Sequence, residues 1–232
     1  MNLLLLSNSR NAGGAYLAHA LEAFAALVGA RRRAWFVPFA AVTVDWDDYT
    51  QMVQAALQPL GLTVTGAHHG TAPDEHDVIL VGGGNTFYLL RECRRRGLLM
   101  PIRRLARAGM PYAGWSAGSN LTCPTIRTTN DMPIVDPDGF DALGFLSFQI
   151  NPHYTNALPA GHQGETREQR LAEFVRANPE VDVLGLPEGD WLTVNGDAVA
   201  LHGPHPAVWI HDGEPPRQVP AGRLSAPFAA MP

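Results

Sequence analysis

Residues 110–120 read Met-Pro-Tyr-Ala-Gly-Trp-Ser-Ala-Gly-Ser-Asn, a short apolar run followed by a serine between two glycines. The pattern G-x-S-x-G places Ser116 at its centre. In a nucleophile elbow, such a serine sits on a sharp turn between a strand and a helix, and Gly114 and Gly118 relieve the crowding there. The stretch predicts an α/β protein with Ser116 as nucleophile. The alternative interpretation is an ordinary glycine-rich packing turn.

The segments on either side of this turn alternate between short apolar runs and helical patterns. Continuous apolar strands separated by helices favour an α/β fold with a mostly parallel sheet covered by helices on both faces. Asn195-Gly196 indicates a hairpin, and hence a small antiparallel extension near the C-terminus. One domain over residues 1–232 is expected, with the tail after about residue 211 the least informative part. Strands are predicted at residues 2–6, 34–39, 62–66, 77–82, 110–115, 145–150 and 181–186, and helices at 14–28, 46–60, 86–95, 99–108 and 166–177.

Composition and charge exclude several classes of protein. Apolar residues make up 46% of the chain and charged residues 17%, as in a globular protein. All 17 basic residues are arginine, so a lysine Schiff base and a P-loop lysine are excluded. With a net charge of -5, no nucleic-acid partner is expected, and Arg94-Arg95-Arg96 is interpreted as a solvated helix face.

The cysteines and apolar runs bear on location. Cys93 and Cys123 fit neither a metal-binding spacing nor a disulfide framework, so reduced thiols in a cytoplasmic protein are expected. The apolar run at residues 2–6 lacks a basic region before it and is too short for a signal peptide. No apolar stretch approaches the roughly 18 residues of a membrane-spanning helix. No membrane partner is expected.

Ligand sites of parallel α/β sheets lie beyond the carboxyl ends of the strands. The turns after four predicted strands carry Gly83-Gly84, Ser116, His153 and Glu188. We expect these turns to share one edge of the sheet. Together they offer a glycine-rich backbone, a serine, a histidine and a carboxylate, which is the composition of a site for acyl transfer.

A serine hydroxyl needs a base to remove its proton, and His153 is the candidate. The histidine then needs a carboxylate to fix its tautomer, and both Glu188 and Asp131 are candidates. Glu188 is favoured because a strand end orients an imidazole better than a loop does. Asp131 lies in the irregular segment 127–142, whose length and composition predict a lid that closes over the substrate.

The oxyanion hole is predicted to combine the Ala117 N–H with that of Gly84 or a neighbour. The run Gly82-Gly83-Gly84 is not a dinucleotide fingerprint, because Phe87 occupies the place of the third glycine. No cofactor is expected. No metal site is expected either, because the adjacent His68 and His69 would point apart on a strand and no H-E-x-x-H spacing occurs.

Seven stretches, spread from the first residues to about residue 210, carry a resemblance to a known family: LLLLSNS, FVPFA, VGGGNTF, GWSAGSN, CPTIRTTNDMPIVDP, INPHYTNALPAGHQGETREQR and LPEGDW. Through them the chain closely resembles the peptidase E family of serine-type aspartyl dipeptidases over nearly its whole length. Ser119 stands where this family is expected to have alanine, which leaves Ser116 undisturbed.

This resemblance implies hydrolysis of dipeptides with an N-terminal aspartate, on a fold akin to class I glutamine amidotransferases. It implies catalytic roles for Ser116 and His153, with a carboxylate at Asp131 or Glu188. It also implies that Arg167 contacts the aspartyl carboxylate of the substrate, and that the protein is a homodimer. From the residues alone, Arg167 would be a surface arginine of a helix.

Two other hypotheses remain open. The chain order Ser, His, Glu differs from the Ser, Asp/Glu, His order of α/β-hydrolases. An esterase or another small-peptide hydrolase on the same fold is therefore the alternative enzyme. A small-molecule binding protein that has lost its chemistry is the alternative without catalysis.

Overall fold

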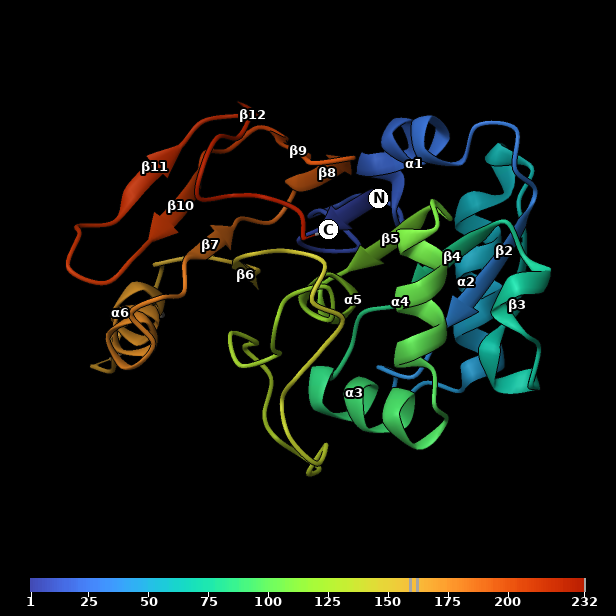
Figure 1. Ribbon diagram of the computed structural model, residues 1–232, viewed down its shortest axis with the longest axis horizontal. Coiled ribbons are helices and arrows are strands. Elements are labelled where there is room, and N and C mark those ends of the chain that lie inside the picture. Colours follow the sequence, from blue (N-terminus) through green and yellow to red (C-terminus); the bar gives the residue numbers. More distant parts are fainter. Residues whose placement is uncertain (159, 162, 232) are drawn as a thin grey trace.

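Two β-sheets organise the chain in the computed structural model, which describes residues 1–158, 160–161 and 163–231 (Figure 1). The larger sheet has the strand order β12-β9-β8-β1-β5-β4-β2-β3, and the smaller one has the order β11-β10-β7-β6. The strands are β1 (Asn2–Leu6), β2 (Arg33–Val37), β3 (Thr63–Gly66), β4 (Val78–Val81), β5 (Tyr112–Trp115), β6 (Gln149–Pro152), β7 (Val183–Leu186), β8 (Trp191–Asn195), β9 (Ala198–His202), β10 (Ala207–Ile210), β11 (Arg217–Val219) and β12 (Gly222–Arg223).

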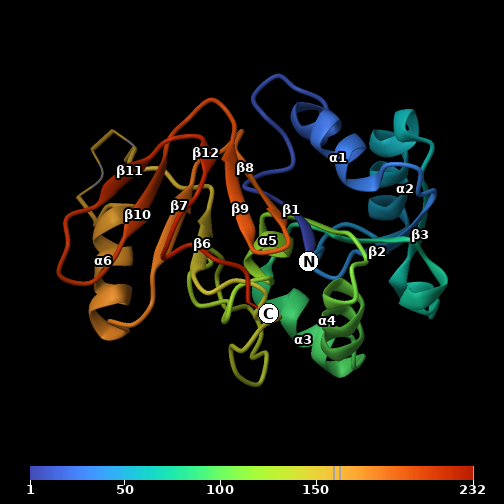
Figure 2. The same cartoon turned by 45° about the horizontal axis from the view of Figure 1, so that its top comes forward.

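The larger sheet combines a parallel part with an antiparallel extension. Strands β1 to β5 pair in parallel, whereas β8 pairs antiparallel with β1 and continues through the hairpin to β9. Helices cover both faces of the parallel part (Figure 2). The helices are α1 (Leu21–Val28), α2 (Trp46–Leu57), α3 (Thr86–Arg95), α4 (Leu99–Arg107), α5 (Ala117–Asn120) and α6 (Arg167–Ala177), with 3-10 turns η1 (Ala18–Ala20), η2 (Gln58–Leu60), η3 (Ala67–His69) and η4 (Pro73–Glu75).

The alternation of buried residues in β1 shows how the sheet separates two cores. Leu4 and Leu6 pack with α1 and α2, whereas Leu3 and Leu5 pack with α3 and α4. Successive side chains of a strand point to opposite faces, so a strand buried on both faces has to be continuously apolar. The run of four leucines in β1 is explained by this double burial.

The smaller sheet stands beside the larger one and shares its core. Ile150 of β6 and Leu184 of β7 belong to the same buried cluster as Leu3 and Leu5 of β1. The far face of this sheet is covered by α6, through Leu171 and Val175 (Figure 1). The expectation of a single domain stays a prediction, which one cooperative unfolding transition would support.

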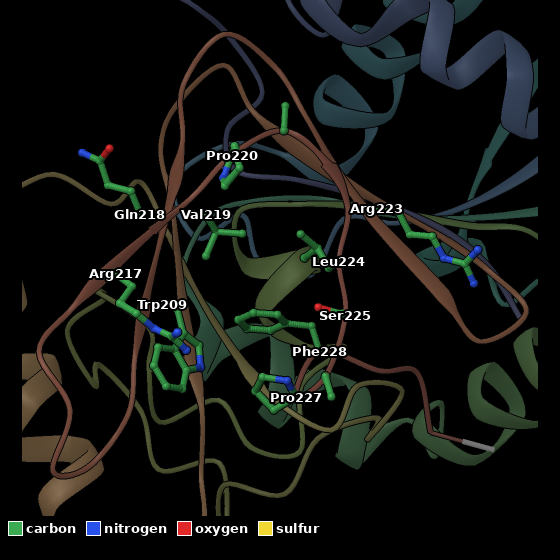
Figure 3. A pocket seen from close by; sticks show the side chains of 12 residues that line it. Trp209, Arg217, Gln218, Val219, Pro220, Arg223, Leu224, Ser225, Pro227 and Phe228 are labelled. Atoms are coloured by element: carbon green, nitrogen blue, oxygen red, sulfur yellow. The ribbon is translucent and has the colours of Figure 1, made fainter.

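The tail after residue 211 joins the two sheets. β11 pairs with β10 in the smaller sheet, and β12, which follows directly, pairs with β9 in the larger one. Leu224 and Phe228 point into the cavity of about 340 Å³ under this crossing, and the Arg217 guanidinium lies over the Trp209 ring (Figure 3). The tail therefore carries more structure than its Pro, Gly and Ala content indicates.

Most expected elements are confirmed, with shifts at their ends. Asp45 caps α2 by accepting from the Asp47 N–H, and Thr166 opens α6 with a full capping box. The strand expected at 145–150 is β6, Gln149–Pro152, so it begins and ends closer to the C-terminus than expected. Among the described residues, every helix is too short or too polar to cross a bilayer.

One expectation about topology is wrong. β6 and β7 do not extend the sheet that contains β5; they form part of the smaller sheet. The turns that carry His153 and Glu188 therefore belong to a different sheet from the turn that carries Ser116. The four turns nevertheless meet, because the carboxyl ends of β6 and β7 face those of β1 and β5 across the seam between the two sheets.

Candidate active site

Ser116 occupies the sharp turn between β5 and α5. Its backbone has φ 52° and ψ -112°, a left-handed conformation that a side chain rarely adopts. A Cβ at Gly114 would lie 2.5 Å from the Gly118 carbonyl oxygen, and one at Gly118 would overlap the Val81 carbonyl. Both glycines are therefore required by the close approach of β5, α5 and β4. The turn has the backbone of a nucleophile elbow.

The two other candidate nucleophiles nearby are buried. The Ser119 hydroxyl has no exposed surface and is shared between the carbonyls of Leu6 at 2.7 Å and Gly114 at 2.9 Å. It joins α5 to β1 and β5. Burial raises the pKa of the Cys123 thiol to about 12. Neither group can act as a nucleophile at neutral pH in this position.

His153 follows β6 directly and reaches Ser116 across the seam. Its Nε2 lies 2.8 Å from the Ser116 Oγ. The His153 backbone has φ 54°, and its N–H donates to the Ser7 Oγ at 2.8 Å. The Ser7 hydroxyl in turn donates to the Leu186 carbonyl at 2.8 Å. Ser7 thus ties the histidine turn to β1 and β7.

The Glu188 carboxylate completes a hydrogen-bonded series. Its Oε1 lies 2.7 Å from the His153 Nδ1. A proton on Nδ1 that is held by a carboxylate leaves Nε2 free to accept from the serine hydroxyl. The Glu188 side chain is 60% exposed, so solvent screens its charge. The adjacent Gly189 N–H donates to the Asn8 Oδ1 at 2.8 Å, which fixes this turn against β1.

Asp131, the other candidate acid, lies elsewhere. Its Oδ2 accepts from the Thr86 N–H at 2.7 Å, from the Thr86 hydroxyl at 2.6 Å and from the Thr129 hydroxyl at 3.0 Å. Thr86 is the first residue of α3, where a negative charge is favourable. Within the described part of the chain, Asp131 makes no hydrogen bond to His153. Its bonds instead anchor the segment 127–142 to α3.

The candidate oxyanion donors lie on either side of Ser116. Ala117 begins α5, and the glycine loop passes so close that a Cβ at Gly83 would lie 3.1 Å from the Ser116 Cβ. Gly84 has φ 135°, and a Cβ there would overlap the Ala40 carbonyl. Among the described residues, no protein acceptor takes a hydrogen bond from the Ala117 or Gly84 N–H. Neither N–H group is occupied by these residues, as the role of an oxyanion donor requires.

A cavity of about 650 Å³ opens beside Ser116 and His153. Its lining is mainly apolar and includes Tyr16, Val42, Val44, Met52 and Ile134. Ile134 comes from the segment 127–142, the expected lid. No arginine of the described chain lines this cavity. The cavity suits an apolar group better than a carboxylate, because its described lining is mainly apolar and holds no arginine.

Arg167, the first residue of α6, is linked to the turn that carries His153 through Asn130. The guanidinium contacts the Asn130 Oδ1, and the Asn130 amide donates to the Pro152 carbonyl at 2.7 Å, directly before His153. Partial burial, and secondarily Arg170, lower the pKa of Arg167. Within the described ranges, no carboxylate of the protein forms an ion pair with it. A half-buried cation without a counter-charge is suited to bind a carboxylate.

The expectation that the side chains of His68 and His69 point apart on a strand is wrong. His68 and His69 lie in the 3-10 turn η3, not on a strand, and their rings converge. The structure brings together Ser116, His153, Glu188 and the candidate oxyanion donors, and separates Asp131 from His153. Ser7 is the residue that sequence reasoning missed. Ser7 belongs to the stretch LLLLSNS of the resemblance, but a serine after a strand has no distinctive spacing that would indicate its role.

Comparisons with known proteins give one consistent result. The model of "Peptidase family S51" matches residues 3–202. Peptidase E of Shigella flexneri and that of Escherichia coli strain K12 / DH10B are each 54% identical to this chain over 226 residues, which cover 96% of this chain and 99% of the relative.

Solved structures agree with this match. The crystal structure of a putative peptidase E from Listeria monocytogenes EGD-e superposes with a TM-score of 0.66 at 25% identity, covering 88% of this chain and 98% of that one. A peptidase from an acI-B1 Actinobacterium superposes with a TM-score of 0.70 at 18% identity, covering 97% and 96%, which bears on the fold alone.

Proposed function

Because the chain belongs to peptidase family S51 and is a serine-type dipeptidase, we propose that it hydrolyses dipeptides with an N-terminal aspartate through an acyl-enzyme on Ser116. The observation that carries this proposal is the hydrogen-bonded series from the Ser116 Oγ through His153 to the Glu188 carboxylate, with distances of 2.8 and 2.7 Å. These distances suit proton transfer without rearrangement of the three side chains.

In the first half of the reaction, Ser116 attacks the peptide carbonyl while His153 takes the hydroxyl proton on Nε2. The imidazolium that forms is stabilised by Glu188 through Nδ1–H. The negative charge on the carbonyl oxygen is met by the N–H groups of Ala117 and Gly84. His153 then gives its proton to the leaving amine, and an aspartyl ester remains on Ser116.

In the second half, water replaces the departed amino acid. His153 removes a proton from this water, which attacks the ester carbonyl, and the same N–H groups hold the oxyanion. Collapse of the tetrahedral intermediate returns the proton from His153 to the Ser116 oxygen. Aspartate leaves, and the free enzyme is restored.

The two residues of the dipeptide fit two different surroundings. Arg167 offers a charge-assisted contact to the aspartyl carboxylate, on the side of His153 where Asn130 lies. The mainly apolar cavity beside Ser116 has no cationic lining in the described chain, so it suits the side chain of the second residue. We therefore expect apolar second residues, as in Asp-Leu, to be preferred.

The decisive experiment is capture of the acyl-enzyme. Hydrolysis of Asp-Leu in the presence of hydroxylamine should yield aspartyl hydroxamate in a constant ratio to aspartate, because both nucleophiles compete for one ester. Release of aspartate without hydroxamate would contradict covalent catalysis. N-acetyl-Asp-Leu and p-nitrophenyl acetate, assayed beside Asp-Leu, distinguish a dipeptidase from a broader peptide hydrolase and from an esterase. Binding of Asp-Leu without turnover of any of the three would favour the binding protein.

Two further expectations remain, a homodimer from the family likeness and a cytoplasmic location from the two reduced cysteines. A homodimer predicts a sedimenting species of twice the chain mass in analytical ultracentrifugation. A cytoplasmic location predicts that activity follows the cytoplasmic fraction of the source cell. Both stay predictions, and neither enters the catalytic argument.

A further inference from the structure

Three side chains with metal-binding atoms meet at the start of α2, outside the Ser116 site. The Asp47 Oδ1 lies 2.8 Å from the His68 Nε2 and 2.9 Å from the His69 Nε2. One ligand atom from each of the three residues lies within 4.8 Å of the others. None of the three lines the cavity beside Ser116 or takes part in the proposed mechanism.

Local structure makes these side chains converge. A 3-10 turn has about three residues per turn, so neighbouring side chains diverge by about 120° instead of the half-turn of a strand. Gly66 lets the His68 ring sit against the backbone, because a Cβ at that position would overlap the ring. The rings of His68 and His69 have centroids 4.1 Å apart. Asp47 is held in the first turn of α2 by its N–H bond to Asp45.

From this geometry we propose that Asp47, His68 and His69 bind one divalent transition-metal ion of the zinc type. Two imidazole nitrogens and one carboxylate oxygen are ligands that Zn²⁺ favours, whereas Mg²⁺ and Ca²⁺ take oxygen ligands. Around a tetrahedral ion with bonds of about 2.05 Å, ligand atoms stand about 3.3 Å apart. The two His–Asp separations of 2.8 and 2.9 Å are thus within about half an ångström of that spacing.

The surroundings predict an open and exchangeable site. The side chains of Asp47 and His69 are 58% and 52% exposed, so water fills the remaining coordination positions. Among the described residues, the His68 Nδ1 is buried without a hydrogen-bond partner. Tightly bound metals have histidine ligands whose second nitrogen is hydrogen-bonded. A bound ion would join the start of α2 to η3, next to the edge strand β3.

The test is calorimetric titration of the EDTA-treated full chain with ZnCl₂. One saturable site is expected, with no saturable heat from MgCl₂. His69→Ala and Asp47→Asn should each weaken the association constant by at least about tenfold, since even outer-shell changes at metal sites cost 10- to 100-fold. His211→Ala is the matched control, because His211 pairs with the Asp182 carboxylate at 3.0 Å and stacks on Trp209, away from the three proposed ligands, and should leave Zn²⁺ binding unchanged.

A second variant separates this site from the catalytic centre. His153→Ala should retain the Zn²⁺ isotherm, whereas metal-free His69→Ala should retain hydrolysis of Asp-Leu. Zn²⁺ should raise the unfolding midpoint of the wild type and leave that of His69→Ala and His69→Gln unchanged. The proposal is overturned by absence of saturable binding, by equal isotherms for wild type and His69→Ala, or by loss of binding in His153→Ala. None of these outcomes bears on the role of Ser116.

Discussion

The two sheets contribute to the candidate site in different ways. The larger sheet supplies Ser116 and the glycine loop, and both are fixed by backbone packing that excludes any side chain at Gly114 and Gly118. The smaller sheet supplies His153 and Glu188, whose positions depend on hydrogen bonds, including the one across the seam to Ser7. The proposed nucleophile is therefore built into one sheet, whereas its proposed activation depends on how the two sheets are placed.

Removing the nucleophile should have the largest effect. Ser116→Ala is expected to lower kcat for Asp-Leu by about three to six orders of magnitude, because it removes the hydroxyl that contacts the His153 Nε2. The matched control is Ser119→Ala in the same turn. Its hydroxyl donates to the carbonyls of Leu6 and Gly114, away from His153, so kcat should stay within a few-fold. Full turnover by Ser116→Ala would remove the proposed mechanism.

Replacing the acid that contacts the His153 Nδ1 should have the second-largest effect on kcat. Glu188→Gln should lower kcat by about 10² to 10⁴, because the amide can no longer stabilise the imidazolium; the upper end applies to a buried acid, and Glu188 is largely exposed. Steady-state kinetics on Asp-Leu measures this.

Asp131→Asn is the comparison variant for that measurement. It removes charge-assisted bonds at the start of α3 and should cost about 1–3 kcal/mol of folding stability, with a smaller loss of kcat. A larger kcat loss in Asp131→Asn than in Glu188→Gln would reverse the assignment of the two acids.

Much of the fold could be predicted because it is encoded locally. The strands of the parallel sheet are apolar on both faces, Thr166 and Asp45 are helix caps, and Asn195-Gly196 forms the hairpin. Sheet membership could not be predicted. Whether β6 pairs with β5 or only with β7 depends on long-range packing across the shared core, and the pattern of a single strand carries no information about its partner.

The grouping of the candidate site residues could be predicted where a reactive side chain directly follows a strand. Ser116, His153 and Glu188 each follow a strand, and facing strand ends bring them together although the expected single edge does not exist. Ser7 and the convergence of His68 with His69 were not predictable. Both depend on details that sequence pattern does not report: a hydroxyl bridging two sheets, and a 3-10 turn directly after a short edge strand.

The arginine on the side of the smaller sheet should determine the preference for aspartate. Arg167→Met is expected to lower kcat/KM for Asp-Leu by about 10² to 10³, because a desolvated carboxylate would lose its counter-charge. The ratio of kcat/KM between Asp-Leu and Asn-Leu measures this directly and should fall toward one. Arg170→Met, on the next turn of α6, is the control and should leave the ratio unchanged. An unchanged ratio in Arg167→Met would place the aspartyl carboxylate elsewhere.

The apolar cavity on the side of the larger sheet should determine the second residue. Val44→Asp is expected to lower kcat/KM for Asp-Leu about tenfold while affecting Asp-Gly much less, because about 1–2 kcal/mol of apolar burial would be lost for the leucine side chain. Arg167→Met should reduce kcat/KM for Asp-Leu and for Asp-Gly by the same factor. Equal losses for both substrates in Val44→Asp would mean that the leucine side chain does not enter this cavity.

The smallest effect tests the seam itself. Ser7→Ala removes the hydroxyl that accepts from the His153 N–H and donates to the Leu186 carbonyl. Urea unfolding should show a loss of about 1–3 kcal/mol, and kcat should fall about tenfold because the imidazole is less well held. Ser119→Ala is again the control: its hydroxyl is equally buried, yet both of its bonds stay beside the larger sheet. A similar stability loss without a kcat loss is expected there, and equal kcat losses in the two variants would contradict a special role for the seam.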